Sequence, residues 1–138
     1  MIFIIDEGSK FDAPLSKVLK LLQTEGAHKH PSQLNPSMSM EGEHPVLSFQ
    51  TKSPYGSMAS HKIRMTMLGP VGFLVEYTDG PLSGTKLMQY YISKGDKTGF
   101  TIVGDVKSAF MKDDQLKAAV MKGLETDWRE GRENLKKL

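Results

Sequence analysis

The sequence contains no cysteine, which excludes disulfide bonds, thiolate nucleophiles and metal sites built on cysteine. It also lacks a long apolar run, because the apolar opening of residues 1–5 stops at Asp6 and Glu7. That opening is too short for a membrane span or a signal peptide. We therefore expect a soluble cytoplasmic protein without stable membrane insertion.

A surplus of charge of one sign is missing as well, since the 138 residues carry a formal net charge of only +2. The basic residues are scattered except near the end of the chain, where four of them alternate with two glutamates. Such mixing is typical of a solvated helix face rather than a phosphate-binding stripe, so we predict no nucleic-acid partner. Length and composition are those of one globular domain, which we expect to span residues 1–138.

The last stretch, Asp113 to Leu138, has the period of one long helix. Its apolar positions recur every three or four residues and so share one face. These positions are Leu116, Val120, Leu124, Trp128, Gly131, Leu135 and Leu138. The charged side chains fall on the opposite face, which we expect to be solvated, and Glu130 is among them. At about 1.5 Å per residue the helix would be roughly 38 Å long, so a short chain must wrap a sheet around it.

The N-terminal part predicts one strand followed by two short helices. Residues 1–11 indicate a strand, with a bulge at Gly8-Ser9. Pro14 suits the first position of a helix whose apolar face begins at Leu15 and which ends at Gly26. A second short helical turn is expected between Ala27 and Pro36.

From Ser37 to Phe110 the hydrophobic period changes to two, which is typical of strands. Turn-forming clusters rich in glycine, proline and aspartate, residues 53–56 among them, divide this region into about six strands. Strands joined by short turns pair antiparallel. The sequence therefore predicts an α+β fold. A curved antiparallel sheet of about seven strands wraps around the long C-terminal helix, with two short helices after strand one.

Motifs at both ends carry a resemblance to a known family. Phe11-Asp12-Ala13-Pro14 leads into the first helix, and residues 133–138, ENLKKL, close the last one. In these motifs and in layout the chain resembles the START-like, polyketide-cyclase and pollen-allergen (SRPBCC) superfamily, which has the helix-grip fold. The resemblance implies a deep apolar cavity between sheet and long helix. It also implies a hydrophobic ligand, since family members bind sterols, lipids, polyketides or hormones, while some are cyclases or dehydratases and others co-chaperones.

We expect the ligand space to be lined by apolar residues of the strands and of the last helix. These candidates are Met65, Met67, Phe73, Val75, Tyr91, Leu124, Trp128 and Gly131. Methionine suits an adaptable pocket, and Met38, Met40, Met58 and Met88 extend the strand set, although a single methionine more often fills an ordinary core. Gly131 leaves a gap in the helix stripe, which either admits a neighbouring ring or opens space for a ligand.

Polar candidates for catalysis are few. Asp127 lies at the edge of the apolar stripe, where a carboxylate facing a cavity would gain a raised pKa and act as an acid or base. The more frequent role of such a residue is a salt bridge at the helix rim. Tyr77, Tyr90 and Tyr91 offer hydroxyl groups, and the last two must face opposite sides of their strand. His28 and His30 lie beside a proline with no third ligand nearby, so we predict no metal site and no cofactor.

The leading hypothesis is a domain that binds a hydrophobic or amphipathic small molecule, lipid-, polyketide- or sterol-like, between the sheet and the C-terminal helix. One alternative is a cyclase- or dehydratase-type enzyme, with Asp127 as general base and a tyrosine as hydrogen-bond donor. Another is a co-chaperone-like protein-interaction domain, which an exposed apolar patch would favour. A homodimer is left open.

Overall fold

The computed structural model describes residues 2–23, 30–52 and 58–137. These residues form seven strands and two helices. In chain order they are β1 (Ile2–Phe11), α1 (Leu15–Gln23), β2 (Leu34–Glu41), β3 (His44–Thr51), β4 (Ala59–Met67), β5 (Gly72–Asp79), β6 (Lys86–Lys94), β7 (Lys97–Val106) and α2 (Asp113–Lys136). Within the described residues, neither helix is both long and apolar enough to cross a membrane.

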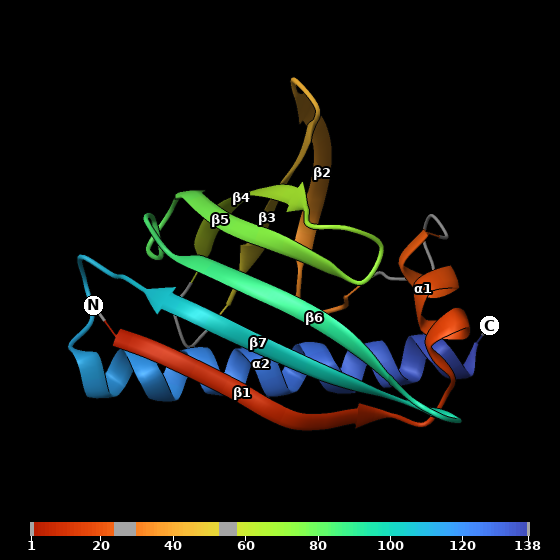
Figure 1. Ribbon diagram of the computed structural model, residues 1–138. Helices are drawn as coiled ribbons and strands as arrows, with labels where there is room; N and C mark the ends of the chain where they lie inside the picture. The colour runs from red at the N-terminus through yellow and green to blue at the C-terminus, as the bar shows by residue number, and fades with distance from the viewer. Residues whose placement is uncertain (1, 24–29, 53–57, 138) are drawn as a thin grey trace.

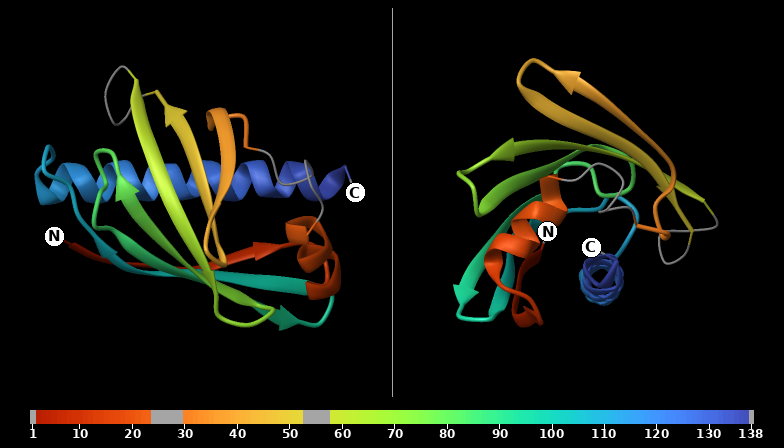
Figure 2. Two further views of the ribbon diagram at one scale, coloured as in Figure 1. Left: turned by 90° about the horizontal axis from the view of Figure 1, so that it is seen from above. Right: turned by 90° about the vertical axis from the view of Figure 1, so that its right-hand side faces the viewer.

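The seven strands form one antiparallel sheet in the order β1-β7-β6-β5-β4-β3-β2. Strands β2 to β7 follow one another as a meander, and β1 completes the sheet by pairing with the last strand. The sheet curves around α2, as the view along that helix in Figure 2 shows. The predicted α+β helix-grip fold is therefore confirmed.

Two glycines shape the strands next to α2. The register of β1 shifts between Asp6 and Ser9, and Gly8 has a positive φ of 90°, so the predicted bulge is present. In β7, a Cβ at Gly104 would collide with the backbone carbonyl of Lys86 on β6. Only glycine allows the two strands to approach this closely.

The segment between β1 and β2 departs in part from the sequence prediction. Helix α1 follows Pro14 as expected and buries Val18 and Leu21. Residues 30–33 form a turn and 34–36 already belong to β2, so no second helix is present in this part of the segment. Residues 24–29, with the expected helix end at Gly26, lie outside the described residues, as does the turn expected at 53–56.

The main core lies between α2, α1 and the β1 side of the sheet. Helix α2 contributes Leu116, Val120, Leu124 and Leu135 to it. The other half of the sheet has its own small cluster of Phe49, Ile63 and Val75. Because α2 packs against β1 and α1, strands β2 and β3 rise away from it (Figures 1 and 2). This arrangement places open space between α2 and the middle of the sheet.

Candidate functional site

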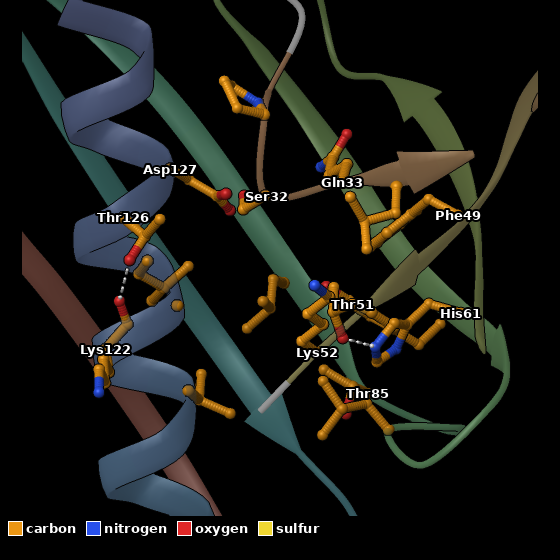
Figure 3. Close-up of a pocket in the computed structure, with 18 residues that line it drawn as sticks. Ser32, Gln33, Phe49, Thr51, Lys52, His61, Thr85, Lys122, Thr126 and Asp127 are labelled. Carbon is orange, nitrogen blue, oxygen red and sulfur yellow. Dashed lines mark hydrogen bonds between the residues drawn. The ribbon is translucent and has the colours of Figure 1, made fainter. Parts of the chain in front are cut away.

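A cavity of about 370 Å³ lies between α2 and the inner face of the sheet (Figure 3). Helix α2 supplies one wall, strands β3 to β6 the opposite wall, and residues 31–34 a third side. Most of the surface is apolar. The apolar lining includes Pro31, Leu34, Phe49, Tyr77, Leu82, Leu87, Val120 and Leu124.

Alternate residues of β4 point inward, and this alternation forms part of the strand wall. Ala59, His61 and Ile63 are buried in alternation, and His61 lies directly opposite Phe49 of β3. The later part of the same face, at Met65 and Met67, becomes progressively exposed. The cavity is thus formed by the first half of β4, whereas the sequence prediction placed it along the second half.

A hydrogen-bonded polar pair, His61 and Thr51, lies in the strand wall. His61 is only 3% exposed, and its Nε2 atom is 2.8 Å from the Thr51 hydroxyl. Its ring stacks on Phe49, with centroids 5.1 Å apart, and meets Tyr77 edge-on. Burial lowers the pKa of His61, which favours the neutral imidazole. His61 was not among the residues predicted for the site, although its alternation with Ile63 on β4 was the available signal.

A second polar group lies where α2 meets residues 30–33. Asp127 lines the cavity and points from α2 toward Ser32 in Figure 3. Desolvation by the surrounding protein raises the pKa of Asp127 to about 6; nearby His30 opposes this shift and the Glu130 charge adds to it. The side chain is nevertheless 48% exposed, so water screens part of this desolvation.

Glu130 fastens residues 30–33 to the helix. Its carboxylate accepts hydrogen bonds from the Ser32 amide at 2.9 Å and the Ser32 hydroxyl at 2.7 Å, and lies 3.1 Å from His30 Nδ1. The Glu130 side chain is only 15% exposed, which corrects the solvated position expected from helix periodicity. The reason is tertiary, because a segment distant in sequence covers this part of α2.

Three of the sequence candidates line the cavity, namely Leu124, Asp127 and Tyr77. Seven others are absent from its described lining, and their ligand-binding role stays a prediction that this cavity does not support. They are Met65, Met67, Phe73, Val75, Tyr91, Trp128 and Gly131.

The physical reasons for these placements differ. Tyr91 is a core residue whose ring packs against Phe11, Phe73 and Phe100, and burial raises its pKa strongly. Val75 is 4% exposed within the second core cluster. At the other extreme, Met67 is 64% exposed.

Trp128 and Gly131 both face β1 instead of the cavity. The Trp128 indole donates a 3.3 Å hydrogen bond to the Lys10 carbonyl, and Arg132 lies over its ring. A Cβ placed on Gly131 would lie 3.4 Å from the Phe11 ring. Of the two alternatives for Gly131, the neighbouring ring is therefore the one that the structure shows.

The strand methionines do not form the cavity either. Met38, Met40, Met58 and Met67 are each at least half exposed, and Met88 contacts the Tyr90 hydroxyl. None of them belongs to the described lining. The wall is built from leucine, valine and aromatic side chains, and Tyr77 is its tyrosine.

Comparison with known proteins identifies the fold. No family model matches the chain, and no curated protein matches its sequence. Solved structures do match: a Thermus thermophilus protein has a TM-score of 0.81 at 10% identity, covering 97% of both chains. A START superfamily protein of Mycobacterium smegmatis has a TM-score of 0.80 at 10% identity, covering 98% of this chain and 97% of that one.

The Zhui aromatase/cyclase of Streptomyces is also similar, with a TM-score of 0.78 at 13% identity over 98% of this chain and 94% of that one. At such low identity these matches show the fold alone. The chain has the START-like helix-grip fold, and at this level the resemblance predicted from its end motifs is confirmed.

Proposed function

We propose that this chain binds a hydrophobic or amphipathic small molecule in the cavity between the sheet and α2. The observation that carries the proposal is the cavity itself. Its volume of about 370 Å³ lies within the range of about 300–1,000 Å³ common for small-molecule sites. An apolar wall with a few polar groups is the usual composition of such a site. The START superfamily and aromatase/cyclase neighbours support the same class of ligand.

The His61–Thr51 pair indicates how a ligand would be oriented in the cavity. Its apolar body would pack against Leu87, Val120 and Leu124, where burial contributes about 25 cal/mol per Å². A neutral His61 beside Thr51 suits an uncharged oxygen, such as a hydroxyl or a carbonyl. An amphipathic ligand with one oxygenated end, lipid-, sterol- or polyketide-like, matches this pattern.

Native mass spectrometry of gently purified protein, combined with displacement of an apolar dye, tests the proposal. We expect Val120→Phe to fill part of the cavity and to weaken dye binding. Ala118→Phe is the matched control, because it adds the same ring at an exposed position of the same helix. A wild-type protein that binds no apolar dye, or a dye affinity lowered equally by both variants, would sink the proposal.

A second candidate is a cyclase- or dehydratase-type enzyme, and Asp127 is the observation that favours it. The residue borders the cavity, and its raised pKa of about 6 brings it toward the range useful for general acid–base catalysis. Above that pKa the carboxylate serves as a base, while Tyr77 brings a hydroxyl to the same cavity. The test is turnover of a cyclisable or dehydratable ligand, which Asp127→Asn must abolish while ligand binding persists.

A further inference from the structure

Three potential metal ligands meet at the rim of the cavity. They are His30 in the turn before β2 and Asp127 and Glu130, three residues apart on α2, and their ligand atoms all lie within 4.8 Å of one another. His30 Nδ1 is 3.1 Å from a Glu130 oxygen and 3.9 Å from an Asp127 oxygen. Asp127 borders the cavity, and Glu130 borders a smaller neighbouring pocket of about 280 Å³.

The distances are compatible with a shared ion. Bonds from zinc to histidine nitrogen or carboxylate oxygen measure about 2.0–2.2 Å, so two ligands of one ion lie no more than about 4.4 Å apart. The two separations from His30 Nδ1 fall below this limit, and the Asp127 and Glu130 oxygens lie within 4.8 Å of each other. Imidazole together with carboxylates suits zinc and manganese, and a divalent ion would balance the two carboxylate charges.

Ser32 adds an independent feature of a built site. Its amide and its hydroxyl each bind a different oxygen of Glu130, at 2.9 and 2.7 Å. Such outer hydrogen bonds orient a ligating carboxylate before the metal arrives. Helix α2 fixes the spacing of the two carboxylates, and residues 30–33 carry the histidine to them.

We propose that His30 Nδ1, Asp127 and Glu130 form a binding site for a divalent transition-metal ion at the cavity rim. Three protein ligands leave a coordination position for water or for a polar group of a molecule in the cavity. The site goes beyond the proposed function, because metal binding is measurable without any apolar ligand. The competing interpretation is a His30–Glu130 contact that only holds the segment on the helix.

The test is a calorimetric titration of EDTA-dialysed protein with zinc and, separately, with manganese. We expect one equivalent to bind, and Asp127→Asn and His30→Gln to lower the affinity at least about tenfold. Ser32→Ala, which removes an orienting hydroxyl, should lower it about 10–100-fold. Asp127→Asn is the decisive variant, because it leaves the Ser32 bonds to Glu130 in place.

The matched controls are His44→Gln, which removes a histidine hydrogen-bonded at Met65 and Thr66, and Glu133→Gln, three residues beyond Glu130 on α2. Both should bind metal as the wild type does. In wild-type protein, substoichiometric manganese should broaden the imidazole NMR signals of His30 before those of His44 and His61. This measurement needs no variant, so it decides the case even where His30→Gln fails to fold.

The proposal is overturned if titration shows no saturable single equivalent, or if Asp127→Asn binds metal as tightly as wild type. The proposal is also overturned if His44→Gln lowers the metal affinity as much as the cluster variants do. Dye displacement, measured on the same sample in EDTA, reports separately on the cavity. Failure of the metal site is thereby distinguished from failure of small-molecule binding.

Discussion

At the scale of single residues, Gly131 leaves room on α2 for the neighbouring Phe11 ring. The Phe11 ring lies beside the position where a side chain would start, and a Cβ there would make an ordinary contact of 3.4 Å. Alanine should therefore fit and add helix propensity, raising the free energy of unfolding by about 0.5–1 kcal/mol. Leucine should overpack against the ring and cost about 1–3 kcal/mol relative to alanine. Urea unfolding of both variants measures this.

The exposed Ala118→Gly substitution on the same helix calibrates the propensity term alone. If Gly131→Leu were more stable than Gly131→Ala, the space beside Phe11 would be open, and the cavity would extend to this part of α2. The periodicity of the sequence placed Gly131 on the inner face, but it could not show which neighbour fills the gap.

His61 predicts a pH dependence of stability. Burial lowers its pKa in the folded protein below the ordinary 6.5, so the unfolded chain binds more protons as the pH falls through 6.5. Stability linked to His61 is therefore present above pH 6.5 and lost on acidification. His61→Gln should remove this loss, and His44→Gln should not. Thermal melts between pH 7.5 and pH 5 measure it, and an unchanged pH slope in His61→Gln would contradict the assignment.

The pH dependence of stability linked to Asp127 has the opposite sign to that of His61. Its folded pKa is raised from 3.8 to about 6, so the folded state holds the proton more strongly than the unfolded chain. The free energy of unfolding thus falls as the pH rises from 3.8 through 6, because the carboxylate becomes charged. Above pH 6 this loss of stability is complete. Asp127→Asn should be more stable than wild type at pH 7 and lose that advantage at pH 3.5. A carboxyl NMR titration midpoint near 4 would instead remove the support for a catalytic base.

At the scale of elements, the Glu130 carboxylate accepts the hydrogen bonds that attach residues 30–33 to α2. Hydrogen bonds to a charged group contribute about 1.5–3 kcal/mol each, so Glu130→Gln should weaken this attachment. We expect the Ser32 amide to exchange its hydrogen about 10–100-fold faster, while core amides of β7 keep their protection. Hydrogen-exchange NMR measures both, and Glu133→Gln serves as the control.

An unchanged exchange rate at Ser32 would show that Glu130 does not hold the segment.

The elements themselves differed in how far the sequence could predict them. Helix α2 and the strands were predictable, because a packed face imposes a period of 3.6 or 2 on the residues. Residues 30–33 were not, because their place is set by contacts to Glu130, which lies far away in the chain.

At the scale of the whole molecule, the wrapping of the sheet around α2 was predictable for a simple reason. A seven-stranded sheet with an apolar face needs a cover, and α2 was the only candidate long enough. The position of the cavity was not predictable, since it depends on how far the sheet curves away from the helix. The sequence candidates on β4 and β5 therefore lay on the correct face but beyond the cavity.

Several molecular properties stay predictions. They are the cytoplasmic location, the absence of a nucleic-acid partner, the single domain over residues 1–138 and the open question of a homodimer. Phe3 and Ile5 on the edge strand β1 are more than half exposed, so apolar surface outside the cavity also exists. An apolar probe can therefore bind in the cavity or on exposed apolar surface, and only the location of the bound probe decides between these.

Methyl NMR during titration with an apolar probe locates that binding most directly. If the cavity is the ligand site, the signals of Leu87, Val120 and Leu124 shift together and saturate with the probe. The exposed methyl groups of Ile5, Leu68 and Ile92 stay in place and serve as internal controls. Shifts confined to these exposed groups, with Val120 and Leu124 unchanged, would contradict the account.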